Sequence, residues 1–293
     1  MAKLAVSIVN FNSGEFLKKC LESLLKIKNE ADLEIWIVDN NSSDNSMVLA
    51  KKALSKFPRK KIILNKENLG FGRAQNQALK EISSDLILVL NPDSEVLPGT
   101  IQYMANFMEK NQDVGAASCK IVKADGSLDI ASHRGFPTPW ASFKYYFLKD
   151  DSLYHLTDRN MEEIHEVDSI VGAFFLTRKS ILEKVGFFDE DYFLYAEDID
   201  LCFKIKEAGY KVMYVPTVKI IHHKGVASGL KKHSQEITTA SKESREKAFN
   251  SFYKTMKIFY RKHLAKNYPF FINWLVYLGI NLKWWLDRKK LIV

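Results

Sequence analysis

Two carboxylates directly follow an unbroken apolar run in the first third of the chain. Leu86–Leu90 is apolar at every position, which is typical of a strand buried on both faces of a parallel sheet, and Pro92 ends it. Asp93 and Glu95 come next, at the edge where open α/β sheets bind ligands. If the turn bends, these two side chains can bind one hard divalent cation. A surface turn with two solvated acids is an equally good interpretation of the pair alone.

A second acidic group, Glu197, Asp198 and Asp200, stands at the start of a predicted helix. Acids at that position are favoured by the helix dipole for structural reasons alone. The aromatic run 192–195 before them also forms a partly apolar rim, and such a rim raises the pKa of a carboxylate toward the range of a general base. Both interpretations stay open on this local evidence.

Two adjacent histidines, His222 and His223, end a late predicted strand. A histidine in this position is usually structural. A neutral imidazole can also complete an Asp/Glu/His set for Mn²⁺ or Mg²⁺, and imidazole favours the softer Mn²⁺. Because side chains alternate between the faces of a strand, we expect only one of the two to point at such a site.

Polar residues cluster where the first two predicted strands end. Asp39 ends the second strand, beside Asn10 and Asn12 at the end of the first, and the turn 40–44 that follows is rich in Asn, Ser and Asp, including Asn41. These side chains can bind a nucleobase and ribose by hydrogen bonds. A turn that only caps the next helix is a comparable interpretation.

Two glycines, Gly70 and Gly72, stand before the third predicted helix. They do not form a dinucleotide-binding fingerprint, because the third glycine is missing and the segment follows the third strand instead of the first. A helix start at which the backbone approaches a ligand remains consistent with them.

Strands and helices alternate along the first half of the chain, which predicts parallel strands with right-handed crossovers and therefore an α/β fold. Region 133–166 has weak periodicity, and a segment that covers the substrate or an ordinary long loop fits it equally. The expected strands are 4–9, 33–38, 62–64, 86–90, 114–122, 211–215 and 218–221, with an apolar stretch over 167–177, and the expected helices follow Ser13 as N-cap, then cover 47–57, 71–82, 98–110, 180–185 and 195–209.

Charge is unevenly distributed over the 293 residues. After residue 230 there are 14 Lys+Arg and 4 Asp+Glu, a net of +10, which leaves −2 for residues 1–230 out of the total of +8. This asymmetry indicates an anionic partner for the tail, either a membrane surface or a nucleic acid. The odd number of widely spaced cysteines and an N-terminus too short for a signal peptide predict a cytoplasmic protein.

Taken together and in this order, the motifs resemble family-2 glycosyltransferases, most closely the rhamnosyltransferase-like branch. The resemblance covers about residues 3–230. The motifs that carry it are Val38-Asp-Asn-Asn-Ser-Ser-Asp44, Asn68-Leu-Gly-Phe-Gly72, Leu90-Asn-Pro-Asp-Ser-Glu95, Val171-Gly-Ala-Phe174, Ala196-Glu-Asp-Ile-Asp-Leu201 and Ile221-His-His223.

The resemblance implies a GT-A fold, which is Rossmann-like with a mostly parallel central sheet flanked by helices. It also implies a nucleotide-diphospho-sugar donor, a divalent metal and inversion at the anomeric carbon. Asp198 matches the catalytic base, with Glu197 beside it. The implied metal ligands are Asp93, Glu95 (where the family usually has a second Asp, so that it acts directly or through water) and His222, and the implied donor-binding residues are Asn10, Asn12, Asp39, Asn41, Asn68, Gly70, Arg73, Asn76, Asp93 and Ser94.

These features predict an inverting glycosyltransferase that uses dTDP-rhamnose or another nucleotide sugar. The expected acceptor is a growing cell-surface polysaccharide or a lipid-linked saccharide. The alternatives are a nucleotidyltransferase and a catalytically silent nucleotide-sugar-binding or scaffold protein. A nucleic-acid binder is disfavoured by the −2 charge of residues 1–230.

The tail, residues 231–293, is expected to form a helical C-terminal appendage to a glycosyltransferase domain at 1–230. Aromatic residues at 249–260 follow a helical period, and Tyr268–Ile280 is apolar but too short for a confident membrane span. Trp284-Trp285 stands next to Arg288-Lys-Lys290, which is typical of a helix in the membrane interface. We therefore expect attachment to the inner face of the cell membrane, and the alternative is a helix packed on the body or in a dimer.

Overall fold

The protein is built around one mixed β-sheet. The computed structural model describes residues 3–223 and 241–288. Six of the nine strands in the described sheet run in the same direction, and β10, β5 and β8 run opposite to them. In spatial order the strands are β3 (Lys60–Leu64), β2 (Asp32–Asp39), β1 (Lys3–Asn10), β4 (Leu86–Leu90), β10 (Phe174–Arg178), β6 (Val114–Val122), β11 (Lys211–His222) and β5 (Ser94–Val96), with β8 (His165–Glu166) paired to β11.

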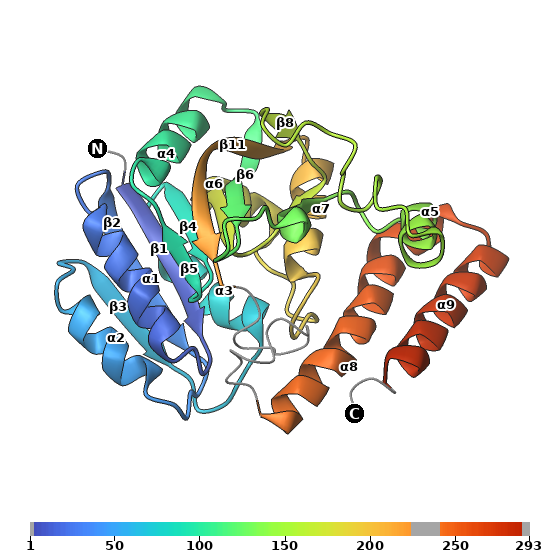
Figure 1. Ribbon diagram of the computed structural model, residues 1–293, viewed down its shortest axis with the longest axis horizontal. Helices are drawn as coiled ribbons and strands as arrows, with labels where there is room; N and C mark the ends of the chain where they lie inside the picture. The colour runs from blue at the N-terminus through green and yellow to red at the C-terminus, as the bar shows by residue number, and fades with distance from the viewer. Residues whose placement is uncertain (1–2, 224–240, 289–293) are drawn as a thin grey trace.

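Helices cover both faces of this sheet (Figure 1). On β4, Leu86, Leu88 and Leu90 pack against one layer of helices, while Ile87 and Val89 pack against the other. The unbroken apolar run of β4 therefore reflects burial on both faces, as predicted. One layer contains α1 (Glu15–Lys26), α2 (Ser46–Leu54) and α4 (Thr100–Lys110), and the other contains α3 (Phe71–Glu81), α6 (Lys179–Val185) and α7 (Glu197–Glu207).

Some predicted boundaries were wrong. The two short strands expected at 211–215 and 218–221 form one strand, β11, whose register against β6 shifts between Val215 and Lys219. Pro216 lies in this gap, and it lacks the N–H that a regular ladder needs, so the strand continues through an irregularity. Gly14, not Ser13, is the N-cap of α1, and the helix expected from Tyr195 begins two residues later, at Glu197.

Region 133–166, for which the sequence predicted no regular elements, contains short elements beside the sheet. Part of it pairs in a small second sheet, β7 (His133–Arg134) with β9 (Ser169–Ile170), after the turn η1 (Ile130–Ser132). The next residues form α5 (Pro139–Phe143) and η2 (Lys144–Leu148). Figure 1 shows α5 near the ends of the two C-terminal helices.

The C-terminal region is helical, as predicted. It comprises α8 (Lys242–Phe259), the turns η4 (Tyr260–Leu264) and η5 (Ala265–Asn267), and α9 (Phe270–Arg288), with α8 and α9 side by side in Figure 1. Ile258 and Phe259 share a buried cluster with Tyr192 and Ile199 of the body. Within the described ranges, no helix has the length and apolarity needed to cross a bilayer. The boundary predicted at residue 230 lies outside the described residues.

Candidate active site

The carboxyl ends of β1 and β2 meet in a buried polar network. The side-chain amide of Asn10 donates to Oδ1 of Asp39 at 2.7 Å and to the hydroxyls of Ser42 and Ser46, each at 2.9 Å. Asp39 also accepts from the backbone N–H of Ser42. The parallel register that pairs Asn10 with Asp39 brings these residues together, as expected for strand ends at one sheet edge. The network fixes the shape of the turn 40–44.

A loop before α3 lies against the loop that leads to α7. Gly70 has φ of 86°, and a Cβ atom built on it would lie 2.3 Å from the carbonyl oxygen of Phe193. Only glycine allows both this backbone conformation and this close approach. The backbone N–H of Phe71 donates to the same oxygen at 2.8 Å, and Asn40 donates to the carbonyl of Gly70 at 3.0 Å. Asn68 accepts from the N–H of Gly70 at 2.9 Å.

Several predicted donor-binding residues are engaged elsewhere. Arg73 forms an ion pair with Glu190 on the surface at 3.1 Å. Asn76 is buried, and its side-chain amide donates to the carbonyl of Phe188 and accepts from the N–H of the same residue. Ser94 is buried and donates to the carbonyl of Ala173. These three residues do not line the cavity described below, and neither do Asn10, Asn12, Asp39, Asn41 or Glu95.

Asp93 and His222 meet in a buried charged cluster. Nε2 of His222 lies 3.1 Å from Oδ1 of Asp93, and its Nδ1 lies 3.9 Å from Oδ2 of Asp129. β5 and β11 pair antiparallel, which places the residue before β5 beside the end of β11. Burial opposes the charged imidazole, but Asp93 and Asp129 together raise the pKa of His222 to about 9. Burial also opposes ionisation of Asp93, yet His222 lowers the pKa of that carboxyl below its usual value.

Glu95 belongs to a separate pair. Its Oε1 lies 2.7 Å from Nε2 of His223, whose ring packs against Phe16 of α1. The two adjacent histidines thus contact different carboxylates, as the alternation of side chains along a strand predicts. The structure does not bring Glu95 to Asp93 and His222.

The chemistry of the Asp93–His222 pair fits a divalent cation. Among the described residues, no three His, Cys, Asp or Glu side chains already surround one point. A full protein cage is not required, because Mg²⁺ is commonly bound by one or two carboxylates together with substrate phosphates. A carboxylate oxygen and an imidazole nitrogen 3.1 Å apart are a suitable pair for Mn²⁺ or Mg²⁺ once the cation takes the place of the proton that the raised pKa keeps on His222. Asp129 faces the other ring nitrogen, the usual position of a group that orients a ligating histidine.

Asp198 stands at the start of α7, after two residues in an uncommon conformation. Tyr195 and Ala196 have φ of 73° and 65°, values that cost a non-glycine residue energy and that are concentrated at functional sites. After this turn, the side chain of Asp198 forms part of the wall of a large cavity, which is described below. Its carboxylate accepts hydrogen bonds from the backbone N–H groups of Ile199 and Gly172. The motif around Gly172 therefore contacts the predicted base directly.

The three acids of α7 differ in environment. Burial raises the pKa of Asp198 above its usual value, although Arg134 and the two N–H donors pull it down. Burial raises the pKa of Glu197 further, well above its usual range, with a contribution from Asp198. Asp200 is 1% exposed and points the other way, toward His263 of η4 at 2.6 Å. Glu197 and Asp198 both line the cavity, but Asp198 is the less buried of the two and has Arg134 and the N–H groups of Ile199 and Gly172 to stabilise its ionised form.

Arg134 and Asp129 were not singled out from the sequence. Arg134 acts on both Asp198 and Asp129 electrostatically, and it donates to the carbonyl of Ala131 at 2.8 Å. Both residues come from the segment between β6 and β9, where no spacing pattern marks them. The only sequence signal is that Asp129 closely follows the turn 124–127. That turn comes after β6, the strand that pairs with β11.

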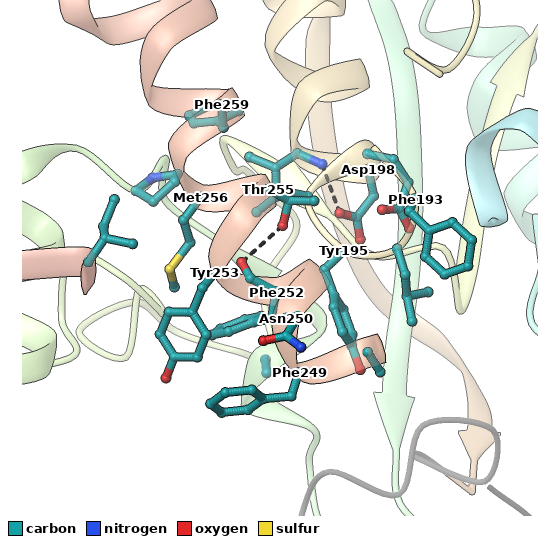
Figure 2. A pocket seen from close by; sticks show the side chains of 18 of the residues that line it. Phe193, Tyr195, Asp198, Phe249, Asn250, Phe252, Tyr253, Thr255, Met256 and Phe259 are labelled. Carbon is teal, nitrogen blue, oxygen red and sulfur yellow. Dashed lines mark hydrogen bonds between the residues drawn. The ribbon is translucent and has the colours of Figure 1, made fainter. Parts of the chain in front are cut away.

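One large cavity joins these groups (Figure 2). Its volume is about 1870 Å³, and Asn68, Gly70, Asp93, Glu197, Asp198 and His222 from the sequence prediction line it together with Asn40, Asp129 and Arg134. Figure 2 shows Asp198 on one side and Phe252, Thr255 and Met256 of α8 beside it. The cavity thus extends from the strand ends to the C-terminal helices.

Comparison with known proteins gives one family. The model described as "Glycosyl transferase family 2" matches residues 5–186 of this chain. The match includes Asp39, Gly70 and Asp93, and it ends before Asp198 and His222.

Two curated relatives share most of their length with the chain. It is 27% identical over 243 residues to N-acetylglucosaminyl-diphospho-decaprenol L-rhamnosyltransferase of Mycobacterium tuberculosis, which covers 77% of this chain and 78% of that protein. It is 28% identical over 225 residues to rhamnosyltransferase WbbL of Escherichia coli strain K12, covering 74% of this chain and 82% of the relative.

A solved structure shares the fold. Mannosyltransferase PcManGT from Pyrobaculum calidifontis, in complex with GDP-Man and Mn²⁺, superimposes with a TM-score of 0.58 at 18% identity. The alignment covers 86% of this chain and 63% of that one, so the chain spans less than two thirds of the solved structure. At this identity the likeness shows the fold alone, and it confirms the expected GT-A architecture.

Proposed function

The chain belongs to glycosyl transferase family 2 and is a glycosyltransferase, and from this premise we propose that it transfers a sugar from a nucleotide-diphospho-sugar to an acceptor hydroxyl with inversion. The observation that supports this most is that Asp198 and the Asp93–His222 pair line one cavity. Inverting transfer needs a base on one side of the sugar and charge compensation for a diphosphate on the other. Residues suited to both chemistries line this one cavity.

Asp198 is the proposed general base. The acceptor oxygen forms a bond to the anomeric carbon while its proton passes to the carboxylate of Asp198, and the bond from that carbon to the diphosphate oxygen breaks. The raised pKa of Asp198 suits it to accept a proton from a hydroxyl. Glu197 is the weaker candidate, because its more strongly raised pKa favours the protonated form.

Asp93 and His222 are the proposed metal ligands, with Mn²⁺ or Mg²⁺ as the ion. When bound, such an ion supplies a Lewis acid that neutralises the charge of the departing diphosphate. The carboxylate of Asp129 faces the other ring nitrogen of His222 at 3.9 Å. We do not include Glu95 as a direct ligand, because His223 engages it. The PcManGT structure, solved with GDP-Man and Mn²⁺, supports the choice of a divalent ion.

For the donor we propose a nucleotide-linked rhamnose, such as dTDP-rhamnose. Both curated relatives are rhamnosyltransferases by name, and one name specifies a decaprenol-linked N-acetylglucosamine diphosphate. By analogy we propose a lipid-linked saccharide acceptor and a role in cell-surface polysaccharide synthesis. Asn68, Gly70 and Asn40 line the cavity, and the Asn10–Asp39 network bonds to Ser42 in the turn 40–44 that begins with Asn40.

We also propose that the C-terminal helices attach the enzyme to an anionic membrane surface. The outward side of α9 exposes Phe271, Trp274, Leu278, Leu282 and Trp285, each between 46% and 63%. Trp284, expected from sequence to act with its neighbour, instead packs on α8, where its Nε1 donates to Asn250 at 3.1 Å. The aromatic contribution to membrane binding thus comes from Trp274 and Trp285.

A donor screen by thermal shift with Mn²⁺ tests the proposal, followed by turnover of the donor that stabilises most. Release of a nucleoside diphosphate and formation of a glycosylated acceptor are expected. Release of pyrophosphate would identify a nucleotidyltransferase instead. Tight donor binding without turnover on any acceptor or water would identify a silent binding protein.

A further inference from the structure

The last described helix, α9, is apolar over most of its surface away from α8, yet none of its residues is buried. Helices of this kind are normally covered on every side. The contacts of α9 divide it into three sectors. One contacts α8, one is exposed to solvent, and one faces the cavity that contains Asp198.

The sector that contacts α8 is polar and aromatic. Tyr260, just after α8, donates to Asn273, and Lys257 of α8 donates to Asn281 at 2.6 Å. Trp284 bonds Asn250 from the same side. These side-chain bonds hold α9 beside α8 at a separation that leaves a groove on the adjoining sector.

The groove sector consists of Ile272, Val276, Gly279 and Ile280, spaced at i, i+4, i+7 and i+8 on one side of the helix. A Cβ atom built on Gly279 meets no heavy atom within 4 Å, so the space in front of this residue is open. The groove is the open volume before these four residues.

The opposite walls of the groove are also apolar. Phe249, Tyr253 and Met256 of α8 line it (Figure 2), and Phe143 and Tyr146 of the α5–η2 segment line it from the other side. Lys283 of α9 lies 5.7 Å from the ring centre of Tyr146, which places α5–η2 next to α9. The groove is therefore a three-walled apolar channel.

The groove is continuous with the reaction site. The same cavity of about 1870 Å³ is lined by Gly279 and also by Asp198 and Arg134. Sites for drug-sized ligands have volumes of roughly 300–1,000 Å³, so this cavity has room for more than a nucleotide sugar. The stretch along Ile272, Val276 and Ile280 is apolar and suits a hydrocarbon chain, while Lys283, Asp287 and Arg288 add charge to the lining toward the carboxyl end of α9.

We infer that this groove holds the proximal part of the acceptor's lipid chain, so that the saccharide at its head reaches Asp198. The inference rests on the lipid-linked acceptor of the proposed function. The exposed sector of α9 lies beside the groove sector on the same helix, so a chain that leaves the bilayer along α9 stays against apolar side chains. Burial of that chain against the groove supplies binding energy in proportion to its apolar area.

The test uses Gly279→Phe in the full chain, with farnesyl diphosphate as the probe and isothermal titration as the readout. The Cβ of the new side chain meets no heavy atom within 4 Å, so the ring has open space to project into, and removal of a helical glycine favours α9. We expect the Kd for farnesyl diphosphate to weaken at least tenfold. Val48→Phe, at an exposed position of α2 that does not line the cavity, is the control and keeps the wild-type Kd. Inorganic diphosphate binds all three proteins equally.

An unchanged Kd in Gly279→Phe, or an equal loss in Val48→Phe, would overturn the inference. Met256→Trp narrows the groove from α8 and gives a second reading if the first variant melts early. A dimer that Gly279→Phe abolishes, without any lipid binding, would assign the groove to a second copy of the chain. Donor turnover on a lipid-free saccharide tests the proposed function separately, because it does not require the groove.

Discussion

Nε2 of His263 lies 2.6 Å from Oδ1 of Asp200, two residues after the proposed base. Asp200 is 1% exposed, and its other charged neighbour, Lys204, is 3.5 Å away. This contact joins the C-terminal segment to the helix that carries Asp198. The acids of α7 therefore differ in role: Asp198 faces the cavity, and Asp200 binds the C-terminal region through His263.

Removal of His263 should destabilise the whole protein. His263→Ala leaves a buried carboxylate without its shortest partner, and the loss of such a partner costs about 1–3 kcal/mol. Urea unfolding measures the change. Lys18→Ala removes an exposed ion pair with Glu15 and serves as control, with an expected effect within about 1 kcal/mol. Equal effects of the two variants would show that the contact contributes no more than a surface pair.

Asp198→Asn should abolish most turnover while keeping the fold. The amide has the shape of the carboxylate but cannot accept a proton, so kcat should fall by roughly 10²–10⁴-fold. Donor affinity, measured by thermal shift, should change little. Near-normal turnover in this variant would move the role to Glu197.

The acid limb of the pH–rate profile should report Asp198. Its pKa is raised above the usual value of an aspartate, so activity should fall on acidification through a pH above 3.8. Arg134 opposes this rise. Arg134→Gln removes the positive charge, which should raise the pKa of Asp198 and shift the acid limb to higher pH, whereas Arg134→Lys retains the charge. A limb that stays in place in Arg134→Gln would exclude this coupling.

Donor binding should require a divalent ion. A chelator should remove the thermal shift that the donor produces with Mn²⁺, and Asp93→Ala and His222→Ala should each weaken binding of donor and ion together. His223→Ala is the matched control, because His223 contacts Glu95 instead. If His223→Ala abolishes the metal dependence and His222→Ala does not, the wrong histidine has been chosen. Insensitivity to the chelator would refute the metal site.

Binding to anionic vesicles should have two components. Salt should weaken the part due to basic residues, each of which is worth about 1 kcal/mol near an anionic leaflet. Trp274→Ala and Trp285→Ala should weaken the part that salt leaves, measured by cosedimentation. Trp284→Ala should mainly affect stability, through its bond to Asn250. A full-length protein that ignores anionic vesicles at low salt would contradict membrane attachment.

Local sequence patterns were sufficient for most of the fold. The apolar run Leu86–Leu90 and the alternation of strands and helices predicted the parallel half of the sheet. The irregular register near Pro216 was missed, because proline usually ends a strand and here only interrupts it. Residues 133–166 gave no periodic signal, since several of their side chains, such as Trp140, Phe143 and Tyr146, line the cavity, while Leu156 reaches the main core.

The site was less accessible from the sequence. Asp93 and His222 come together only because β5 and β11 pair, a contact between residues far apart in the chain. Asp129 and Arg134 lie in irregular backbone, where spacing carries no information. Arg73 and Asn76 stand in a promising motif, but their partners at Phe188 and Glu190 come from a distant loop that the sequence could not place.

Ile199 of α7 packs in one buried cluster with Ile258 and Phe259 of α8, so the C-terminal region cannot be exchanged without changing the core of the body. The family match ends at residue 186, so the helix with the proposed base and the helices beside the groove both lie beyond it. Because these elements bury side chains in each other, the tail is not an exchangeable module. A chimera that receives another tail after residue 230 should fold poorly, because α7 then loses the side chains it packs against. A chimera joined before α7 should fold better, because α7 and α8 then come from the same protein.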